Sequence, residues 1–116
     1  MTLVPFQSRA IVSTAARKSF DAFPADAQKA FFSALHIAAN GSKADNAKPM
    51  SGMGSGVFEI ALRDEGNAFR VIYAVQIGEK LWVVHAFQKK STQGIKTPKH
   101  EIDLIKRRLK LLKEAM

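Results

Sequence analysis

Three consecutive apolar segments between residues 56 and 90 constrain the fold of this chain more than any other feature of its sequence. They read GVFEIALR, FRVIYAVQIG and LWVVHAFQKK, and each is rich in β-branched and aromatic residues. Short polar links separate the segments at residues 64–67 and at Gly78 with Glu79, where a two-residue hairpin turn fits. Runs of this composition, joined by tight turns, predict the strands of an antiparallel meander.

The part of the chain before the meander is expected to contain one strand and two helices. Residues 3–7 read as a short strand. A brief helix is predicted from about Thr14 to Ala22, with Ser13 or the residue after it as the N-cap. From Ala25 to Ala39 the apolar residues recur at helical spacing, which predicts a second helix.

A polar loop and a closing helix complete the expected fold. Residues 41–55 are polar, are broken by glycine and proline, and lead into the meander. Thr97 is suited to be an N-cap with Pro98 at the first helical position, and the helix then extends to about Lys113. We therefore expect an α+β fold, in which a small antiparallel sheet of about four strands packs against the N-terminal helices and a C-terminal helix is added. Residues 1–116 are expected to form a single domain.

The composition indicates a polyanionic partner. The chain has 18 lysines and arginines against 10 aspartates and glutamates, which gives a net charge of +8. A small domain with so positive a surface is suited to bind nucleic acid, because neutralising phosphates releases counterions. The chain has no cysteine, which excludes disulfides, thiolate chemistry and cysteine-based zinc sites. It has no apolar run of about 20 residues and no secretory signal, so we expect it in the cytoplasm, away from membranes.

Arg70 is a charged residue in the middle of an apolar strand. By alternation it shares a face with Ile72 and Ala74, and Tyr73 lies on the opposite face. Helices that cover the more apolar face would leave the face of Arg70 partly open. Since an unpaired charge is costly to bury, Arg70 either reaches an open groove or pairs with a carboxylate such as Glu59.

Two adjacent lysines close the last strand. Lys89 and Lys90 point to opposite sides, so at least one of them can face the same groove as Arg70. Arginine and lysine at such a site can stabilise negative charge on a scissile phosphate. RNA supplies its own nucleophile, the 2′-hydroxyl, so cations and a route for protons are chemically sufficient to cleave it.

His85 lies in the same strand as the lysine pair. It alternates with Val83 and Phe87, and a lone histidine among apolar neighbours is more typical of a hydrogen-bonded core residue than of a catalyst. A direct role in proton transfer would need a base or a phosphate within hydrogen-bond reach. His36 and His100 lie on predicted helices without ligand spacing, so no metal site is expected.

Three stretches of the sequence resemble a known family. KPMSGMGSGVFEIALR, AFRVIYAV and, most specifically, VVHAFQKKSTQGIKTPKHEIDLIKRRL are similar to the phage-derived Gp49-like family, the HigB-type branch of the RelE/ParE toxin superfamily of type II toxin–antitoxin systems. The resemblance implies a compact α+β fold and cleavage of mRNA at the ribosome. It also implies a cognate antitoxin with a helix-turn-helix domain, through which the pair binds operator DNA. It implies no cofactor.

The resemblance also implies roles for individual residues. Arg70 lies where RelE-like toxins bind phosphate, and Lys89 with Lys90 lies where they keep a second catalytic or RNA-binding cation. Glu59 as general base, with His85 or Lys89 as general acid, completes the catalytic hypothesis. Basic residues of the first central strand and of the last helix are expected to bind RNA: Arg63, Lys106, Arg107 and Lys110.

The chain departs from the family pattern in two places. RelE-type toxins often have lysines in the strand where this chain has Glu59 and Ala61, and no tyrosine follows the last strand. Two other functions therefore stay open: ParE-like inhibition of DNA gyrase without cleavage, and a non-catalytic module that binds only its antitoxin and DNA. The cationic sheet favours the nuclease, because an inhibitor has no need of a phosphate-facing Arg70 and Lys89.

Overall fold

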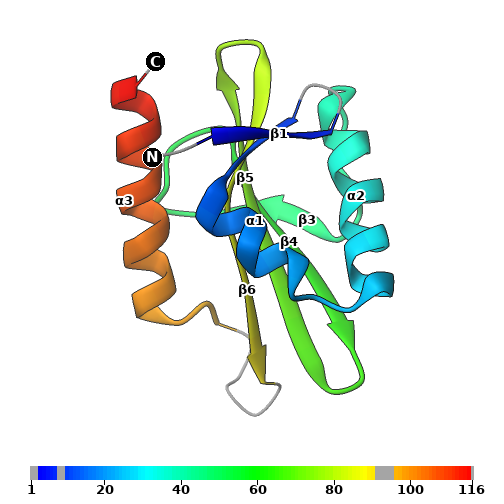
Figure 1. Ribbon diagram of the computed structural model, residues 1–116. Coiled ribbons are helices and arrows are strands. Elements are labelled where there is room, and N and C mark those ends of the chain that lie inside the picture. Colours follow the sequence, from blue (N-terminus) through cyan, green and yellow to red (C-terminus); the bar gives the residue numbers. More distant parts are fainter. Residues whose placement is uncertain (1–2, 8–9, 91–95, 116) are drawn as a thin grey trace.

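The meander forms the centre of a six-stranded sheet in the computed structural model of the chain (Figure 1). The structure describes residues 3–7, 10–90 and 96–115. In chain order the elements are β1 (Leu3–Gln7), β2 (Ala10–Ser13), α1 (Thr14–Asp21), α2 (Ala25–Ala39), β3 (Ala47–Pro49), β4 (Val57–Asp64), β5 (Asn67–Ile77), β6 (Lys80–Lys90) and α3 (Lys99–Ala115). The strand order across the sheet is β1-β2-β6-β5-β4-β3. None of these helices has both the length and the apolar character that crossing a bilayer requires.

The three predicted strands of the meander are confirmed. β4 pairs antiparallel with β5 along its whole length, and β5 pairs antiparallel with β6. The turn between β4 and β5 has positive φ angles of 48° at Glu65 and 80° at Gly66. Two successive positive φ angles are what a type I′ hairpin requires, and this turn matches the twist of the strands that it joins.

The prediction of about four antiparallel strands is wrong, although the α+β class is right. The sheet has six strands and is mixed, because β2 runs parallel to β6 with Ala10 opposite Leu81 and Val12 opposite Val83. β3 lies within residues 41–55, where the sequence indicates only a loop. Both additional strands are too short to show an alternation of their own, and they form because a longer strand offers its edge.

The helix boundaries are close to those predicted. The Oγ of Ser13 accepts a hydrogen bond of 3.2 Å from the N–H of Ala16, so Ser13 caps α1 as expected. α2 has the predicted bounds. α3 begins at Lys99, one residue later than expected, and the N–H of Ile102 donates to the carbonyl of Pro98. Pro98 therefore lies directly before the helix, and the Thr97 hydroxyl donates to Glu59.

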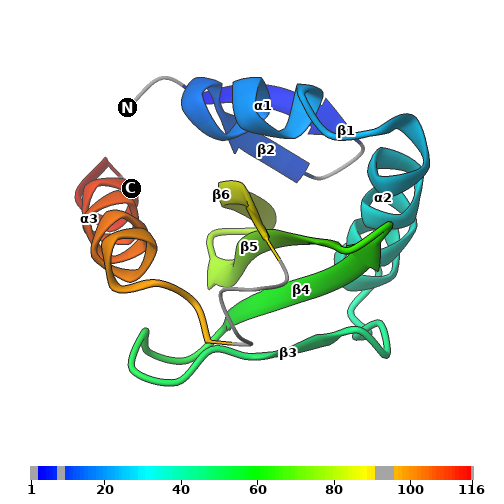
Figure 2. The same cartoon turned by 90° about the horizontal axis from the view of Figure 1, so that it is seen from below.

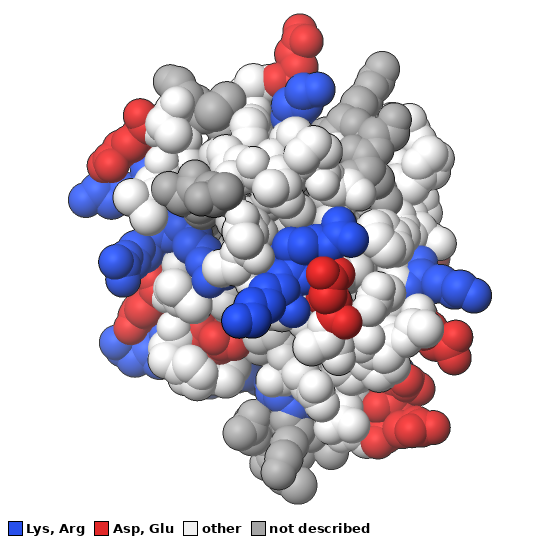
Figure 3. Space-filling model, in the orientation of Figure 1, with Lys and Arg blue, Asp and Glu red and all other residues white. Residues whose placement is uncertain are grey.

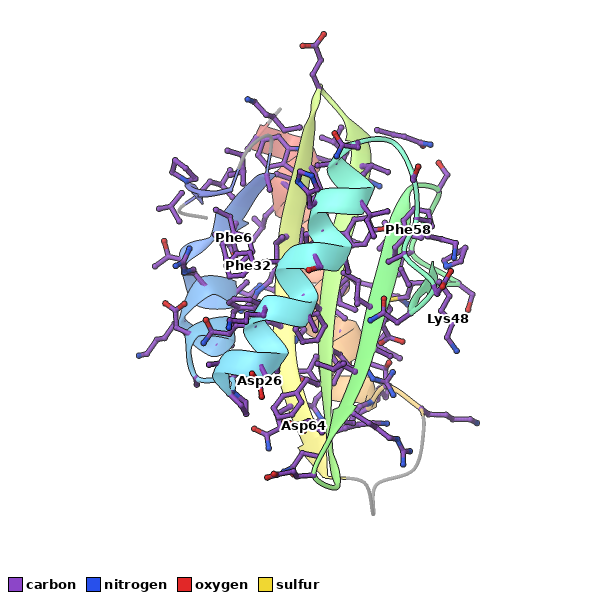
Figure 4. The ribbon with its side chains drawn as sticks, turned by 90° about the vertical axis from the view of Figure 1, so that its right-hand side faces the viewer. Phe6, Asp26, Phe32, Lys48, Phe58 and Asp64 are labelled. Atoms are coloured by element: carbon purple, nitrogen blue, oxygen red, sulfur yellow. The ribbon has the colours of Figure 1, made fainter. Side chains whose placement is uncertain are left out.

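One face of the sheet is buried by α1 and α2. Phe20 of α1 and Phe31 of α2 are fully buried there with strand residues such as Val71, and we call this cluster the α2-side core. Figure 4 shows Phe6 and Phe32 on this side of the sheet, with ring centroids 5.0 Å apart. Apolar burial on this face is what attaches both N-terminal helices to the meander.

The opposite face is covered by α3 (Figure 2). Ile105 and Leu109 of α3 pack with Ile72 and Ala74 of β5 in what we call the α3-side core. Each such buried side chain contributes roughly 1.5–3 kcal/mol to folding. The face that bears Arg70 is therefore covered by a helix along part of its length, and only its remaining part is available for a site.

A β-bulge in β6 places His85 on the face that α3 covers. His85 is paired with Ile72, whereas the next pair joins Val83 to Tyr73, so Val84 is an extra residue in β6. Val83 packs in the α2-side core and Val84 in the α3-side core. The prediction that His85 alternates in step with Val83 is therefore wrong, because the bulge reverses the alternation after Val84.

Gly56, just before β4, allows a test of the close approach between the start of β4 and Val75 of β5. Its φ is 78°, and a Cβ there would lie 2.7 Å from the carbonyl oxygen of Val75, whereas Gly66 has a similar φ of 80° and no atom within 4 Å of such a Cβ. Alanine at either position brings left-handed strain of roughly 1–2 kcal/mol, and Gly56→Ala adds a clash of about 1–3 kcal/mol. We expect urea denaturation to show a larger loss of unfolding free energy for Gly56→Ala than for Gly66→Ala. Equal losses would contradict the close approach of Val75.

Candidate functional site

Three adjacent strands bring charged side chains together on the α3 face of the sheet. β4 contributes Glu59, β5 contributes Arg70 and β6 contributes Lys89, and the pairing registers place all three on one face. Tyr73 lies on the opposite face, as predicted, within the α2-side core. Glu59, Arg70 and Lys89, together with Arg63 of β4, form what we call the charged cluster.

Glu59 is bonded to two other parts of the chain. Its Oε1 accepts a hydrogen bond of 3.0 Å from Arg70 Nη1, and its Oε2 accepts one of 2.7 Å from Thr97 Oγ1. The side chains of the ion pair are only 11% exposed for Arg70 and 12% for Glu59. Of the two alternatives that the sequence leaves open for Arg70, the structure shows the internal pairing with Glu59.

Lys89 is buried, with only 4% of its surface exposed. Its Nζ donates a hydrogen bond of 2.7 Å to the carbonyl oxygen of Lys96. Burial lowers the pKa of Lys89 below its ordinary value, the nearby Arg70 and Arg63 lower it as well, and Glu59 partly opposes them. The Lys89 ammonium therefore gives up a proton more readily than an exposed lysine does.

Positive charge exceeds negative charge in the charged cluster. Among the described groups that act on Lys89, Arg70 and Arg63 are cationic and Glu59 is anionic. An excess of cations in a partly desolvated place is stabilised by an anion with several acceptor oxygens, and phosphate is such an anion. The arrangement is therefore suited to bind a phosphate group.

The segment that leads into α3 is attached to the sheet through this cluster. Lys96 accepts the hydrogen bond from Lys89, and Thr97 donates the one to Glu59. This role of Thr97 is not predicted from the sequence, because helix capping explains a threonine before a proline equally well. Nothing in the local sequence connects positions 59 and 97, so no signal there could have revealed the contact.

His85 belongs to a second polar network, which joins β6 to α3. Its Nδ1 accepts a hydrogen bond of 2.6 Å from Arg108 Nη1, and its Nε2 lies 3.3 Å from Glu101 Oε1. Because an arginine can only donate, these partners assign the proton to Nε2 and make the ring neutral. Arg108 also donates to the carbonyl of Val84, with a distance of 3.1 Å. The network thus fixes the bulge against the helix.

The cations of α3 are divided between two sides of the helix. Lys106 and Lys110 line a hollow together with Met53, whereas Arg107 lines a groove that faces α1. The predicted RNA-binding residues of this helix therefore do not all lie on one side of it. Their binding of RNA stays a prediction.

At the exposed border of the charged cluster its own member Arg63 lies near two further lysine positions of the strands. Arg63 is exposed. Lys48 of β3 lies opposite Glu59 in the strand register, and its exposed side chain extends outward (Figure 4). Lys90 ends β6 opposite Asn67, and its side chain lies outside what the structure describes. Arg63 and Lys48 thus extend the positive charge of the cluster to its exposed edge.

Comparison with known proteins identifies one family. Residues 18–110 match the profile of the family described as phage-derived protein Gp49-like (DUF891). This range contains every residue of the charged cluster and of the His85 network. No curated protein matches the chain.

The His85 network predicts a specific dependence of stability on pH. Burial, followed by the charge of Arg108, lowers the pKa of His85 below its ordinary value of 6.5, with Glu101 opposing. Between the lowered value and 6.5 the unfolded chain binds a proton that the folded chain does not, so stability falls as the pH decreases through this window. We expect the unfolding free energy of the wild type to fall relative to that of His85→Asn from about pH 8 to about pH 5.

Urea denaturation at a series of pH values measures this difference. His36→Asn, which removes an exposed imidazole from α2, is the control for the loss of a histidine. A difference between wild type and His85→Asn that stays constant over the range would contradict a neutral, buried His85.

Proposed function

Because the chain belongs to the Gp49-like family, which is a family of HigB/RelE-type toxins, we propose that it is the toxin of a type II toxin–antitoxin system and cleaves mRNA at the ribosome. A cognate antitoxin with a helix-turn-helix domain neutralises it, and operator DNA is bound only through their complex. The observation that carries this proposal is the partly buried charged cluster, in which Arg63, Arg70 and Lys89 surround Glu59.

Binding of RNA exchanges the hydrogen-bond partners within the cluster. In the structure, Arg70 donates to Glu59, and Lys89 donates to the carbonyl of Lys96. A scissile phosphate presents oxygens that can accept from both cations in place of these internal partners. Donors held in partly desolvated surroundings stabilise the charge of the transition state more strongly than donors in water do.

The same residues supply the proton transfers. The 2′-hydroxyl attacks the adjacent phosphorus and passes its proton to the carboxylate of Glu59, while Lys89 protonates the departing 5′-oxygen. The products are a 2′,3′-cyclic phosphate and a free 5′-hydroxyl. The lowered pKa of Lys89 suits a general acid. Between the two candidate acids the geometry favours Lys89, because it lies beside Arg70 and Glu59 in the charged cluster, whereas His85 bonds to Arg108 and Glu101 of α3.

Tyr73 does not replace the tyrosine that is absent after β6. It is buried in the α2-side core, where its ring stacks on Phe58 with centroids 5.3 Å apart. Burial raises the pKa of Tyr73 above its ordinary value, so the phenol stays protonated. The chemistry proposed here therefore depends on Glu59 and Lys89 rather than on a tyrosine.

The central test is cleavage of mRNA by variants of the two cations. Lys89→Met keeps the aliphatic stem, and Arg70→Lys keeps a positive charge beside Glu59, so both variants are expected to fold. We expect Lys89→Met to lower cleavage by about 10²–10³-fold, and Arg70→Lys to lower it as well, since an oriented donor to the phosphate is lost in each. Primer extension on a reporter mRNA after induction measures this. Lys29→Met, which alters an exposed lysine of α2 on the other side of the sheet, is the matched control and should cleave normally.

The same induction separates the proposal from its alternatives. Growth arrest with intact mRNA and a DNA-damage response would contradict the nuclease and indicate inhibition of gyrase. Expression without growth arrest would indicate a module that only binds its antitoxin and DNA.

A second variant tests the proton acceptor. Glu59→Gln keeps the shape of the side chain and removes the charge that takes the proton from the 2′-hydroxyl. General base catalysis contributes typically 10²–10⁴-fold, and we expect a loss in this range in the same primer-extension assay. Undiminished cleavage by Glu59→Gln would remove Glu59 from the mechanism and leave it as the partner of Arg70.

A further inference from the structure

A groove lies between α1 and α3, the two helices labelled at the centre and on the left of Figure 1. Two hollows of about 460 Å³ and 410 Å³ make up this groove, and they are contiguous because Leu104 and Arg108 line both. The groove exists because β2 pairs with β6 only from Leu81 to Val83, after which the chain turns into α1. We call it the α1–α3 groove.

The walls of the α1–α3 groove are largely apolar. Ala15 and Leu111 line the upper hollow together with Leu104, and Phe23 and Phe87 line the lower one. Leu111 is 41% exposed, and within the described part of the chain only Ile37, on α2, is a comparably exposed large apolar residue. An exposed leucine beside an apolar hollow is typical of a surface that a partner covers.

The rim of the groove is positive. Lys18 of α1 and Arg107 of α3 are exposed on its two sides, and Arg108 lines its middle. Glu101, which lines the lower hollow, lies against His85. Figure 3 shows lysine and arginine side chains over both α1 and α3 on this face. The groove therefore complements a ligand with an apolar centre and acidic flanks.

We propose that the α1–α3 groove binds an acidic amphipathic helix of a protein partner, which under the proposed function is the antitoxin. A groove with a helix on each side accepts a third helix, whose apolar residues at helical spacing enter between the two. Its flanking carboxylates pair with Lys18 and Arg107. The identification of the partner as the antitoxin rests on the proposed function, whereas the groove and its chemistry do not.

The position of the groove gives the bound helix a direct effect on the candidate site. Phe87 lines the lower hollow, is paired with Arg70 in the register of β5 and β6, and lies on the same face as Lys89. A helix that fills the groove therefore ends beside the charged cluster. Its bulk and its negative charge there oppose the approach of an RNA strand.

A peptide selection tests the proposal without any use of toxicity. A display library of random peptides of about 20 residues, long enough for several helical turns, is selected against the purified chain. We expect the enriched peptides to be acidic, with apolar residues at helical spacing. Synthetic copies of them are then measured for binding to variants by fluorescence anisotropy.

Matched pairs of variants locate the binding site. Leu111→Glu and Lys18→Glu, both at exposed positions of the groove, are each expected to weaken binding at least about tenfold, which corresponds to about 1.4 kcal/mol. Ile37→Glu and Lys29→Glu make the same changes at exposed positions of α2 and should leave binding unchanged. Denaturation curves confirm that each variant is folded.

Three results would overturn the groove as a docking site: no enriched peptide, enriched peptides without acidic character, or equal losses in the groove variants and the α2 variants. None of these results bears on whether the chain cleaves mRNA. Conversely, if the chain fails to cleave mRNA but binds acidic helices through Leu111 and Lys18, the proposed nuclease activity is contradicted and the docking site is established.

Discussion

A carboxylate and a guanidinium that are both largely excluded from water hold the candidate functional face of this protein together. Arg70 lies in a central strand with buried neighbours, and a charge in that position is tolerated because Glu59 on the adjacent strand neutralises it. The same carboxylate accepts the hydrogen bond from Thr97. The position of the described segment that leads into α3 therefore depends on this ion pair.

Apolar and polar contacts have different roles along α3. The stripe of Ile105, Leu109 and Leu112 supplies burial, which is strong but non-directional. The hydrogen bonds of Arg108 to His85 and to the bulge carbonyl are directional, and they fix the rotation of the helix about its axis. Because its rotation is fixed, one side of the helix faces Met53, in the loop between β3 and β4, and the other side faces α1.

The sequence predicts those parts of the fold in which a residue's neighbours along the chain decide its structure. β-branched runs reveal the meander, and alternation alone puts Arg70 opposite Tyr73 and allows Lys89 to join it. β2 and β3 escape prediction because they have only 4 and 3 residues and exist through pairing with longer strands. The face on which His85 lies was not predictable, because the extra residue Val84 does not alter the composition of the strand. The contact of Thr97 escapes because its partner lies 38 positions away.

The bulge at Val84 divides β6 into two parts of opposite phase. Before it, Val83 points toward α2; after it, Lys89 points toward the charged cluster, although both positions are odd-numbered. Removing Val84 would leave Lys89 on its present face, because Val83 and His85 would keep their partners in β5. Removing one residue between the bulge and Lys89 would instead turn Lys89 toward the α2-side core and put Lys90 in its place. The number of residues after the bulge thus decides which lysine faces the charged cluster, and a substitution leaves that number unchanged.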